Sequence, residues 1–334
     1  MENRRLGPEG PDVSAIGLGA MSLAGIYGAA SEEEAHAVLA TALDLGIDHV
    51  DTSNVYGMGR SEEMIGSFLA RQGKTRDGRF RIATKAGILR NPAPDGKRFE
   101  NSAAHLTAEL EGSLKRLGLD CVDLFYVHRR DRTIPIEEVT QTLAGLVRAG
   151  KTRAFGFSEI APSSLRRAAA VHPVAAVQSE YSLSTRAPEL GLVQACAALG
   201  TALVAFSPVG RGLLTDHPKG AEAIAASQFL TTNPRFQAPN LAANLAQTDR
   251  FRALAAEMGT PAAALAIAWL RARGPGVIPI PGTRSVAHLR ELAAGTALDL
   301  SAADLARIEA VLPVGWAHGD RYSDAQWTGP ERYC

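Results

Sequence analysis

The stretch Gly46-Ile-Asp-His-Val-Asp51-Thr-Ser-Asn-Val-Tyr56-Gly57 follows one helical pattern and precedes another. Its apolar part, residues 46–50, is typical of a short buried strand, and its polar part begins where that strand ends. Gly46 suits the left-handed position that ends a helix. The stretch therefore reads as the centre of one strand–loop–helix unit of an α/β protein.

The same unit repeats along the chain, and eight repeats over about 270 residues predict a closed (β/α)8 barrel. Pro279 lies in the last candidate strand and alone would suggest an edge strand, but the period requires a strand there. Such barrels carry their chemistry in the loops at the C-terminal ends of the strands. The eight candidate strands are residues 15–19, 47–50, 80–84, 122–127, 154–157, 175–178, 202–206 and 277–280.

Polar residues mark where helices begin. Ser31-Glu-Glu-Glu34 predicts a capping box, and Ser61 predicts the start of the next helix. Thr260-Pro261 predicts a helix with Thr as the cap and Pro in the first turn. Ser301 begins an extra helix after the barrel, and turn residues within residues 4–13 predict a small N-terminal hairpin.

Three segments are longer than ordinary connections. Residues 90–101 follow the third strand and residues 212–247 follow the seventh, so both are expected as active-site loops of a single barrel domain spanning residues 1–334. Residues 313–334 form a tail, which either packs on the outside of the barrel or covers its mouth.

Composition limits the classes of partner. The 334 residues carry a formal net charge of zero and are 46% hydrophobic, which is typical of a globular protein and argues against a nucleic-acid or anionic-membrane surface. No apolar run reaches the length of a membrane span, and no signal peptide is visible. Cys121, Cys196 and Cys334 have no metal-binding spacing. We expect reduced thiols and a cytoplasmic protein.

Four chemically distinct groups follow or end three of the strands: Asp51, Tyr56, Lys85 and His128. Alone, each has an ordinary interpretation, such as a loop cap, a half-buried aromatic or an exposed charge. Together, at matching positions of one barrel, they indicate a site that protonates a carbonyl oxygen.

These residues lie in motifs that resemble the aldo-keto reductases. Asp51-Thr-Ser-Asn-Val-Tyr56-Gly is similar to the family signature Asp-Thr-Ala-x-x-Tyr-Gly. Ala83-Thr-Lys85 and Tyr126-Val-His128 match the family's lysine and histidine positions. Three further segments, beginning at Gln178, Ser207 and Ile280, are similar to its cofactor-binding stretches. The segments Glu180-Tyr-Ser-Leu and Gly210-Arg-Gly are most similar to those of the microbial and plant branches, which act on general aldehydes and ketones.

The resemblance implies an NADP(H)-dependent oxidoreductase that reduces a small-molecule aldehyde or ketone. In the implied mechanism Tyr56 is the general acid. A free phenol has a pKa of about 10, and a nearby cation lowers that value, a role for Lys85. Asp51 balances the ammonium of Lys85, and His128 orients the carbonyl oxygen.

The resemblance also implies the cofactor site. Ser158 and Gln178 would bind the carboxamide, and Phe206, where the family usually has Tyr, would stack on the nicotinamide. Arg284 would bind the 2′-phosphate, which favours NADPH over NADH. Leu292 replaces a common Asn near the adenine. The implied cofactor residues are Met21, Asp51, Ser158, Gln178, Phe206, Ser207, Pro208, Gly210, Arg211, Gly282, Thr283, Arg284, His288 and Glu291.

Other interpretations remain at this stage. The same barrel could serve as a binding or regulatory protein, similar to the potassium-channel β subunits, and Lys85 could be the nucleophile of a Schiff-base aldolase. Gly17-Leu-Gly lacks the rest of a Rossmann fingerprint, and no cluster of ligands predicts a metal site. The pocket walls are expected from Met21, Ile26, Tyr27, Val55, residues 88–100 and the long loop after the seventh strand, and their apolar and aromatic lining favours substrates with hydrophobic groups. The oligomeric state is open.

Overall fold

The computed structural model describes residues 1–8, 10–26, 28, 30–73, 79–227 and 229–333. Tyr27 and Cys334, named above, lie outside the described residues. Eight parallel strands form one sheet in the order β10-β9-β8-β7-β6-β5-β4-β3. Two hydrogen bonds join the first and last strands, from Gly17 N to Pro279 O (2.8 Å) and from Gly19 N to Pro281 O (2.9 Å). The sheet is therefore a closed barrel, as predicted.

All eight predicted strands are present. The structure shortens the first, second and eighth of them, extends the third, fifth and sixth, and keeps the bounds of the fourth and seventh. The strands are β3 (Leu18–Gly19), β4 (His49–Asp51), β5 (Arg81–Ala86), β6 (Val122–Val127), β7 (Thr152–Ser158), β8 (Ala176–Glu180), β9 (Ala202–Phe206) and β10 (Val277–Pro279).

Pro279 is tolerated in β10 because its missing N–H is not needed on the β9 side. The N–H of Ile280 donates to Ala205 O at 2.9 Å, and Pro279 contributes its carbonyl to Gly17 on the other side. A proline is tolerated within a sheet where the neighbouring strands need only its carbonyl oxygen as a hydrogen-bond acceptor.

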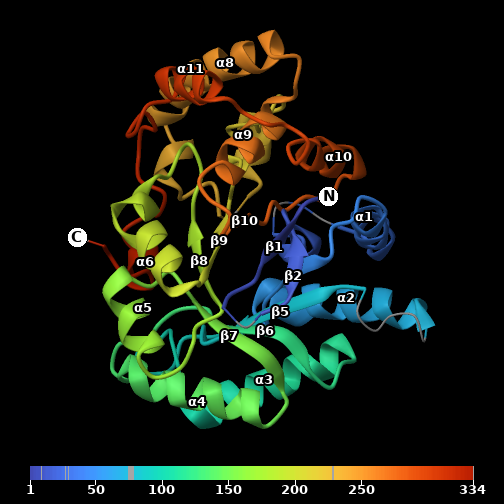
Figure 1. Ribbon diagram of the computed structural model, residues 1–334, viewed down its shortest axis with the longest axis vertical. Helices are drawn as coiled ribbons and strands as arrows, with labels where there is room; N and C mark the ends of the chain where they lie inside the picture. Colours follow the sequence, from blue (N-terminus) through green and yellow to red (C-terminus); the bar gives the residue numbers. More distant parts are fainter. Residues whose placement is uncertain (9, 27, 29, 74–78, 228, 334) are drawn as a thin grey trace.

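Helices surround the strands (Figure 1). Glycines in the left-handed region end several of them, including Gly46 (φ 75°) and Gly118 (φ 67°). The barrel helices are α1 (Glu32–Asp44), α2 (Arg60–Arg71), α3 (Ala103–Leu117), α4 (Ile136–Arg148), α5 (Pro162–Ala169), α6 (Leu192–Leu199), α9 (Ala262–Arg271) and α10 (Val286–Ala294).

The helix starts agree with the sequence at Ser31 and Ser301, where both capping boxes form. Two starts differ. Helix α2 begins at Arg60, and the Ser61 hydroxyl is buried and donates to Ala20 O (3.0 Å). Helix α9 begins after Pro261, and its first N–H, from Ala262, donates to the Asp216 carboxylate (2.9 Å). In both cases the expected cap is replaced by a hydrogen bond to a segment distant in the sequence, Ala20 for Ser61 and Asp216 for Ala262.

The predicted N-terminal hairpin is β1 (Asn3–Arg5) paired antiparallel with β2 (Asp12–Ser14). Leu6 and Val13 pack in one cluster with inward side chains of the barrel, including Leu124, Val204 and Ile278. The hairpin therefore closes the end of the barrel opposite the strands' C-terminal ends, and one face remains open for a site.

The segment after β9 is more ordered than expected. It contains α7 (Ala221–Ala225), and α8 (Asn240–Glu257) begins inside the range 212–247 that the sequence suggests as loop. Helix α8 lacks a clear apolar stripe because Asn244 and Thr248 are among its fully buried residues. Asn244 donates to Arg235 O (3.0 Å) and His318 O (2.9 Å), which compensates its burial.

The extra C-terminal helix is α11 (Ala302–Val311), and the tail runs from it past α6 (Figure 1). Within the described residues no single helix is long and apolar enough to cross a membrane, although the bent pair α8 and α9 passes that test by length and composition.

Candidate active site

The C-terminal ends of β4 and β5 place an acid, an amine and a phenol in contact. The Lys85 ammonium donates to the Asp51 carboxylate, to Thr52 O (2.8 Å) and to the Tyr56 hydroxyl (3.3 Å). Lys85 is fully buried, whereas Tyr56 is half-buried and faces the opening. The buried amine therefore borders the pocket through two side chains that it contacts, Asp51 and Tyr56.

Asp51 keeps the buried amine charged. Burial acts against the charge on Lys85, but the Asp51 carboxylate and Tyr56 outweigh it, so the pKa of Lys85 lies above its ordinary value. The second Asp51 oxygen accepts a hydrogen bond from Gln178 Nε2 (2.8 Å). Both oxygens of the carboxylate are thus held, and its orientation toward Lys85 is fixed.

His128 follows β6 and lies beside Tyr56. The two rings meet edge to face with centroids 5.7 Å apart, and Ser53 Oγ contacts His128 Nδ1 at 3.1 Å. Burial lowers the pKa of His128 well below its ordinary value, and the charges of Arg129 and Lys85 lower it further. The imidazole is therefore neutral near pH 7 and can donate a hydrogen bond without carrying charge.

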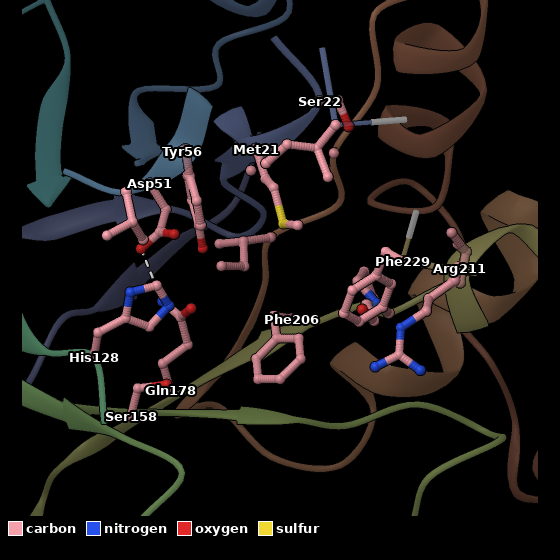
Figure 2. Close-up of a pocket in the computed structure, with 18 of the residues that line it drawn as sticks. Met21, Ser22, Asp51, Tyr56, His128, Ser158, Gln178, Phe206, Arg211 and Phe229 are labelled. Carbon is pink, nitrogen blue, oxygen red and sulfur yellow. Dashed lines mark hydrogen bonds between the residues drawn. The ribbon is translucent and has the colours of Figure 1, made fainter. Parts of the chain in front are cut away.

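These groups open into a pocket of about 730 Å³, within the range of small-molecule and cofactor sites. Tyr56, His128, Ser158 and Gln178 lie at one end, Phe206 lies in the middle, and Arg211 and Phe229 lie toward the other end (Figure 2). All the sequence-predicted site residues line this pocket except Lys85, which lies behind Tyr56, and Gly210, which packs against Ser184 Oγ.

Basic side chains gather at the end of the pocket away from Tyr56. Arg284 and His288 from the start of α10 share this wall with His217 and Lys219 from the segment after β9. The rings of His217 and His288 stack with centroids 6.4 Å apart. Burial and then the charge of Arg284 lower the pKa of Lys219. Cations that repel one another in this way favour an anion between them.

The residues present fit a phosphorylated dinucleotide. The α10 N-terminus, with Ser285 as its cap, presents backbone N–H groups to the cationic end, a setting that favours phosphate. Phe206 offers a flat face in the middle, and Ser158 and Gln178 offer hydroxyl and amide groups at the other end. The predicted residues Met21, Ser207, Pro208, Gly282, Thr283 and Glu291 complete the wall.

Arg211 departs from the simple expectation of a pyrophosphate contact. Its side chain is buried, pairs with Glu180 (2.6 Å) and donates to Arg321 O (3.0 Å). Glu180 also contacts Arg235 (3.5 Å) and Arg321 (3.8 Å), and Arg321 pairs with Glu159. This buried ion network ties the tail and the segment after β9 to the ends of β7 and β8.

Several residues of the site were missed by sequence reasoning. Tyr322, Gln326 and Gly329 of the tail line the pocket, as do Arg129 and Ser22. Two features of the sequence could have indicated them: Arg129 directly follows the predicted site residue His128, and the tail is rich in aromatic residues.

The backbone is strained around the site. Among the residues that the structure describes, four that are not glycine have positive φ: Met58 (58°), Glu159 (57°), Ser207 (50°) and Arg211 (57°). Each lies within a few residues of a predicted site residue. Such conformations cost free energy and persist where the surrounding structure fixes them, most often at functional sites.

Comparisons with known proteins cover nearly the whole chain. The model of the Aldo/keto reductase family matches residues 15–313. The Schizosaccharomyces pombe protein "aldo-keto reductase yakc (NADP(+))" is 38% identical over 313 residues, which cover 93% of this chain and 92% of that protein. "Probable aldo-keto reductase 1" of Glycine max is 38% identical over 320 residues, covering 95% and 91%. A solved glycerol dehydrogenase from Gluconobacter oxydans superposes with a TM-score of 0.79 at 27% identity, covering 93% and 94%.

Proposed function

The chain belongs to the aldo/keto reductase family, and from that premise we propose that it reduces aldehydes or ketones to alcohols with NADPH, using Tyr56 as general acid. The family consists of oxidoreductases that use NADP(H), and one relative carries NADP(+) in its name. A cytoplasmic location stays a prediction.

The observation that supports the role of Tyr56 most directly is its contact with Lys85. The phenol oxygen lies 3.3 Å from a buried ammonium and at the wall of the pocket. A cation at that distance can stabilise the negative charge that the phenol oxygen gains as it gives up its proton to a bound carbonyl.

The chain's own residues account for the proton. NADPH, when bound, supplies the hydride to the carbonyl carbon. Tyr56 transfers its hydroxyl proton to the carbonyl oxygen, and the Lys85 ammonium stabilises the phenolate that remains until solvent returns the proton. Neutral His128 lies beside the same position and orients the carbonyl oxygen by a hydrogen bond. Asp51 holds Lys85 in place and balances its charge.

The supports for NADPH are Arg284, Lys219 and the α10 N-terminus. A 2′-phosphate adds two negative charges near the cationic end of the pocket, where NADH has only a hydroxyl. Guanidinium and ammonium groups pair well with phosphate oxygens.

The aldolase alternative is disfavoured by the state of Lys85. A Schiff base needs an uncharged amine, but the Asp51 pair raises the pKa of Lys85. Borohydride should therefore fail to trap a ketone on the protein. A purely regulatory role would be indicated by NADPH binding without turnover of any carbonyl.

Steady-state assays on a panel of aromatic and aliphatic aldehydes, each with NADPH and with NADH, test the proposal. We expect turnover with most aldehydes and a kcat/KM for NADPH at least tenfold above that for NADH, a difference of about 1.4 kcal/mol. NADPH binding without turnover of any aldehyde would reject the reductase, and equal use of NADH would reject the role given to Arg284.

A further inference from the structure

Arg129 occupies the reacting end of the pocket. It follows His128 in the chain and lines the cavity. Its Nη1 donates to His128 O (2.6 Å) and to Ser158 Oγ (3.0 Å), and its Nη2 donates to Tyr322 Oη (3.2 Å). All three acceptors are neutral oxygens.

The charge of Arg129 has no carboxylate partner within 4.0 Å among the described residues. Arg129 is half-buried, and two buried arginines near it differ, since Arg321 pairs with Glu159 and Arg211 pairs with Glu180. A guanidinium has five N–H groups, and the hydrogen bonds above use three of those of Arg129. Two N–H groups of this pocket-lining side chain therefore have no acceptor among the described residues, and its charge has no carboxylate partner there.

The positive field of Arg129 reaches its neighbours. Its charge is, after burial, the largest cause of the lowered pKa of His128, and it contributes to the lowered pKa of Glu159. Two cations therefore act on His128, which lines the proposed carbonyl site: Arg129, which follows β6, and the Lys85 ammonium behind Tyr56.

The side chain of Arg129 is held before any ligand arrives. A Cβ on Gly329 would lie 2.9 Å from Arg129 Cδ and 3.0 Å from Phe99 Cζ, so the tail backbone at Gly329 packs closely on the aliphatic stem of Arg129 and on Phe99. Phe99, Ile88 and Leu89 add apolar surface to the same pocket. A fixed guanidinium beside an apolar wall suits a ligand with one anionic group on a hydrophobic body.

We propose that Arg129 binds a carboxylate of the substrate, and that the preferred substrates are aldehydes or ketones carrying a carboxylate on an apolar body. The inference rests on the proposed reductase function and specifies its substrate class. The two available N–H groups and the planar guanidinium match a carboxylate, and the ion pair forms inside a pocket rather than at an exposed surface.

Two matched aldehydes test the proposal. 4-Carboxybenzaldehyde and methyl 4-formylbenzoate have the same aldehyde and similar shape, but only the first is charged at pH 7. We expect the native protein to favour the acid over the ester in kcat/KM by about tenfold or more, the effect of one charge-assisted hydrogen-bonded pair. Arg129→Met should reduce this ratio to near one, and Arg129→Lys should keep part of it.

The ratio separates substrate binding from a positioning role. Arg129 also contacts Ser158 and Tyr322, so its loss can slow both aldehydes together, but a common loss leaves the ratio unchanged. Arg98→Met is the matched control, because Arg98 lines the same pocket and donates to Ala325 O (3.3 Å) from an exposed position. This variant should retain the preference for the acid.

Three results would overturn the inference: a native ratio near or below one, a ratio that survives Arg129→Met, or a ratio that is lost in Arg98→Met. In each of these the ester is still reduced, so the reductase function stands. If neither aldehyde is reduced although NADPH binds, the reductase proposal fails and the inference falls with it.

Discussion

Tyr56 is the residue on which the proposed chemistry depends. Tyr56→Phe removes the hydroxyl that contacts Lys85 and leaves the ring against His128. We expect kcat to fall by about 10²- to 10⁴-fold, the usual contribution of a positioned acid. Steady-state kinetics on a neutral aldehyde measure this fall.

NADPH affinity should stay within about threefold of native in the same variant, because the cationic end of the pocket is untouched. Titration of NADPH fluorescence measures it. A Tyr56→Phe protein with near-native kcat would exclude Tyr56 as the proton donor.

His128 couples stability to pH. Its folded pKa is depressed, so below the unfolded value of about 6.5 the unfolded chain binds a proton that the folded protein does not. Stability linked to His128 is therefore present above pH 6.5 and is lost as the pH falls toward the folded pKa.

His128→Gln removes this linkage. Between pH 6.5 and 5.5 the native protein should lose about 1 kcal/mol more unfolding free energy than the variant does. Urea unfolding of both proteins at the two pH values measures the difference. Parallel losses would show that His128 ionises normally in the folded protein.

Asp51, Lys85 and His128 could be placed from sequence because the ends of parallel strands share one face of a barrel. The contact between Gln178 and Asp51 could not be predicted, because it joins positions 127 residues apart across the barrel. The partners of Arg129 depend in the same way on the course of the tail, for which the sequence has no periodic pattern.

At the scale of elements, the start of α10 is expected to decide the choice of cofactor. Arg284→Met removes one cation from the group that includes Lys219. We expect the KM for NADPH to rise about tenfold or more, while the KM for NADH changes less than threefold. Initial rates at varied cofactor concentration measure both. A parallel rise for the two cofactors would place Arg284 elsewhere than at the 2′-phosphate.

The tail is fastened by the buried ion network. Arg321→Met leaves Glu159 and Glu180 buried with fewer partners, and we expect a loss of about 3 kcal/mol in unfolding free energy. Urea unfolding at pH 7 measures it. Arg307→Met breaks an exposed pair with Glu257 (2.9 Å) and should cost at most about 1 kcal/mol. Equal effects of the two variants would contradict the importance of the network.

Elements with local signals were predicted well, such as α1 and α11 with their capping boxes. Helix α8 was placed partly in a loop because its buried face is polar, and a polar face gives no hydrophobic period. The starts of α2 and α9 were displaced because distant atoms, of Ala20 and Asp216, supply the hydrogen-bond partners.

At the scale of the whole molecule, the seam between β3 and β10 depends on Gly17. A Cβ there would lie 2.8 Å from the His49 ring and 3.0 Å from Ile280 Cγ2. Gly17→Ala should therefore lower the unfolding free energy by about 1–3 kcal/mol through overpacking. Urea unfolding gives the value.

Gly145→Ala is the matched control. Gly145 lies inside α4, and the nearest atom to a Cβ is Arg148 Nη2 at 3.8 Å. We expect a gain of about 0.5–1 kcal/mol from better helix propensity. Losses of similar size in both variants would show that the seam is no tighter than the helix.

The barrel was predictable because strand patterns and helix patterns alternate regularly along the sequence. Its closure was only inferred from the number of units, since no local feature of residues 17–19 identifies residues 279–281 as their partner. The hairpin was predictable, but its position in the barrel interior follows from packing of Leu6 and Val13.

The seam also orders events during translation. Residues 277–281 leave the ribosome after the other seven barrel strands, so the β3 edge stays unpaired until they emerge. Parallel edges exposed in this way invite pairing with other nascent chains. Chaperone dependence during expression should therefore concentrate in the interval before the last strand is made.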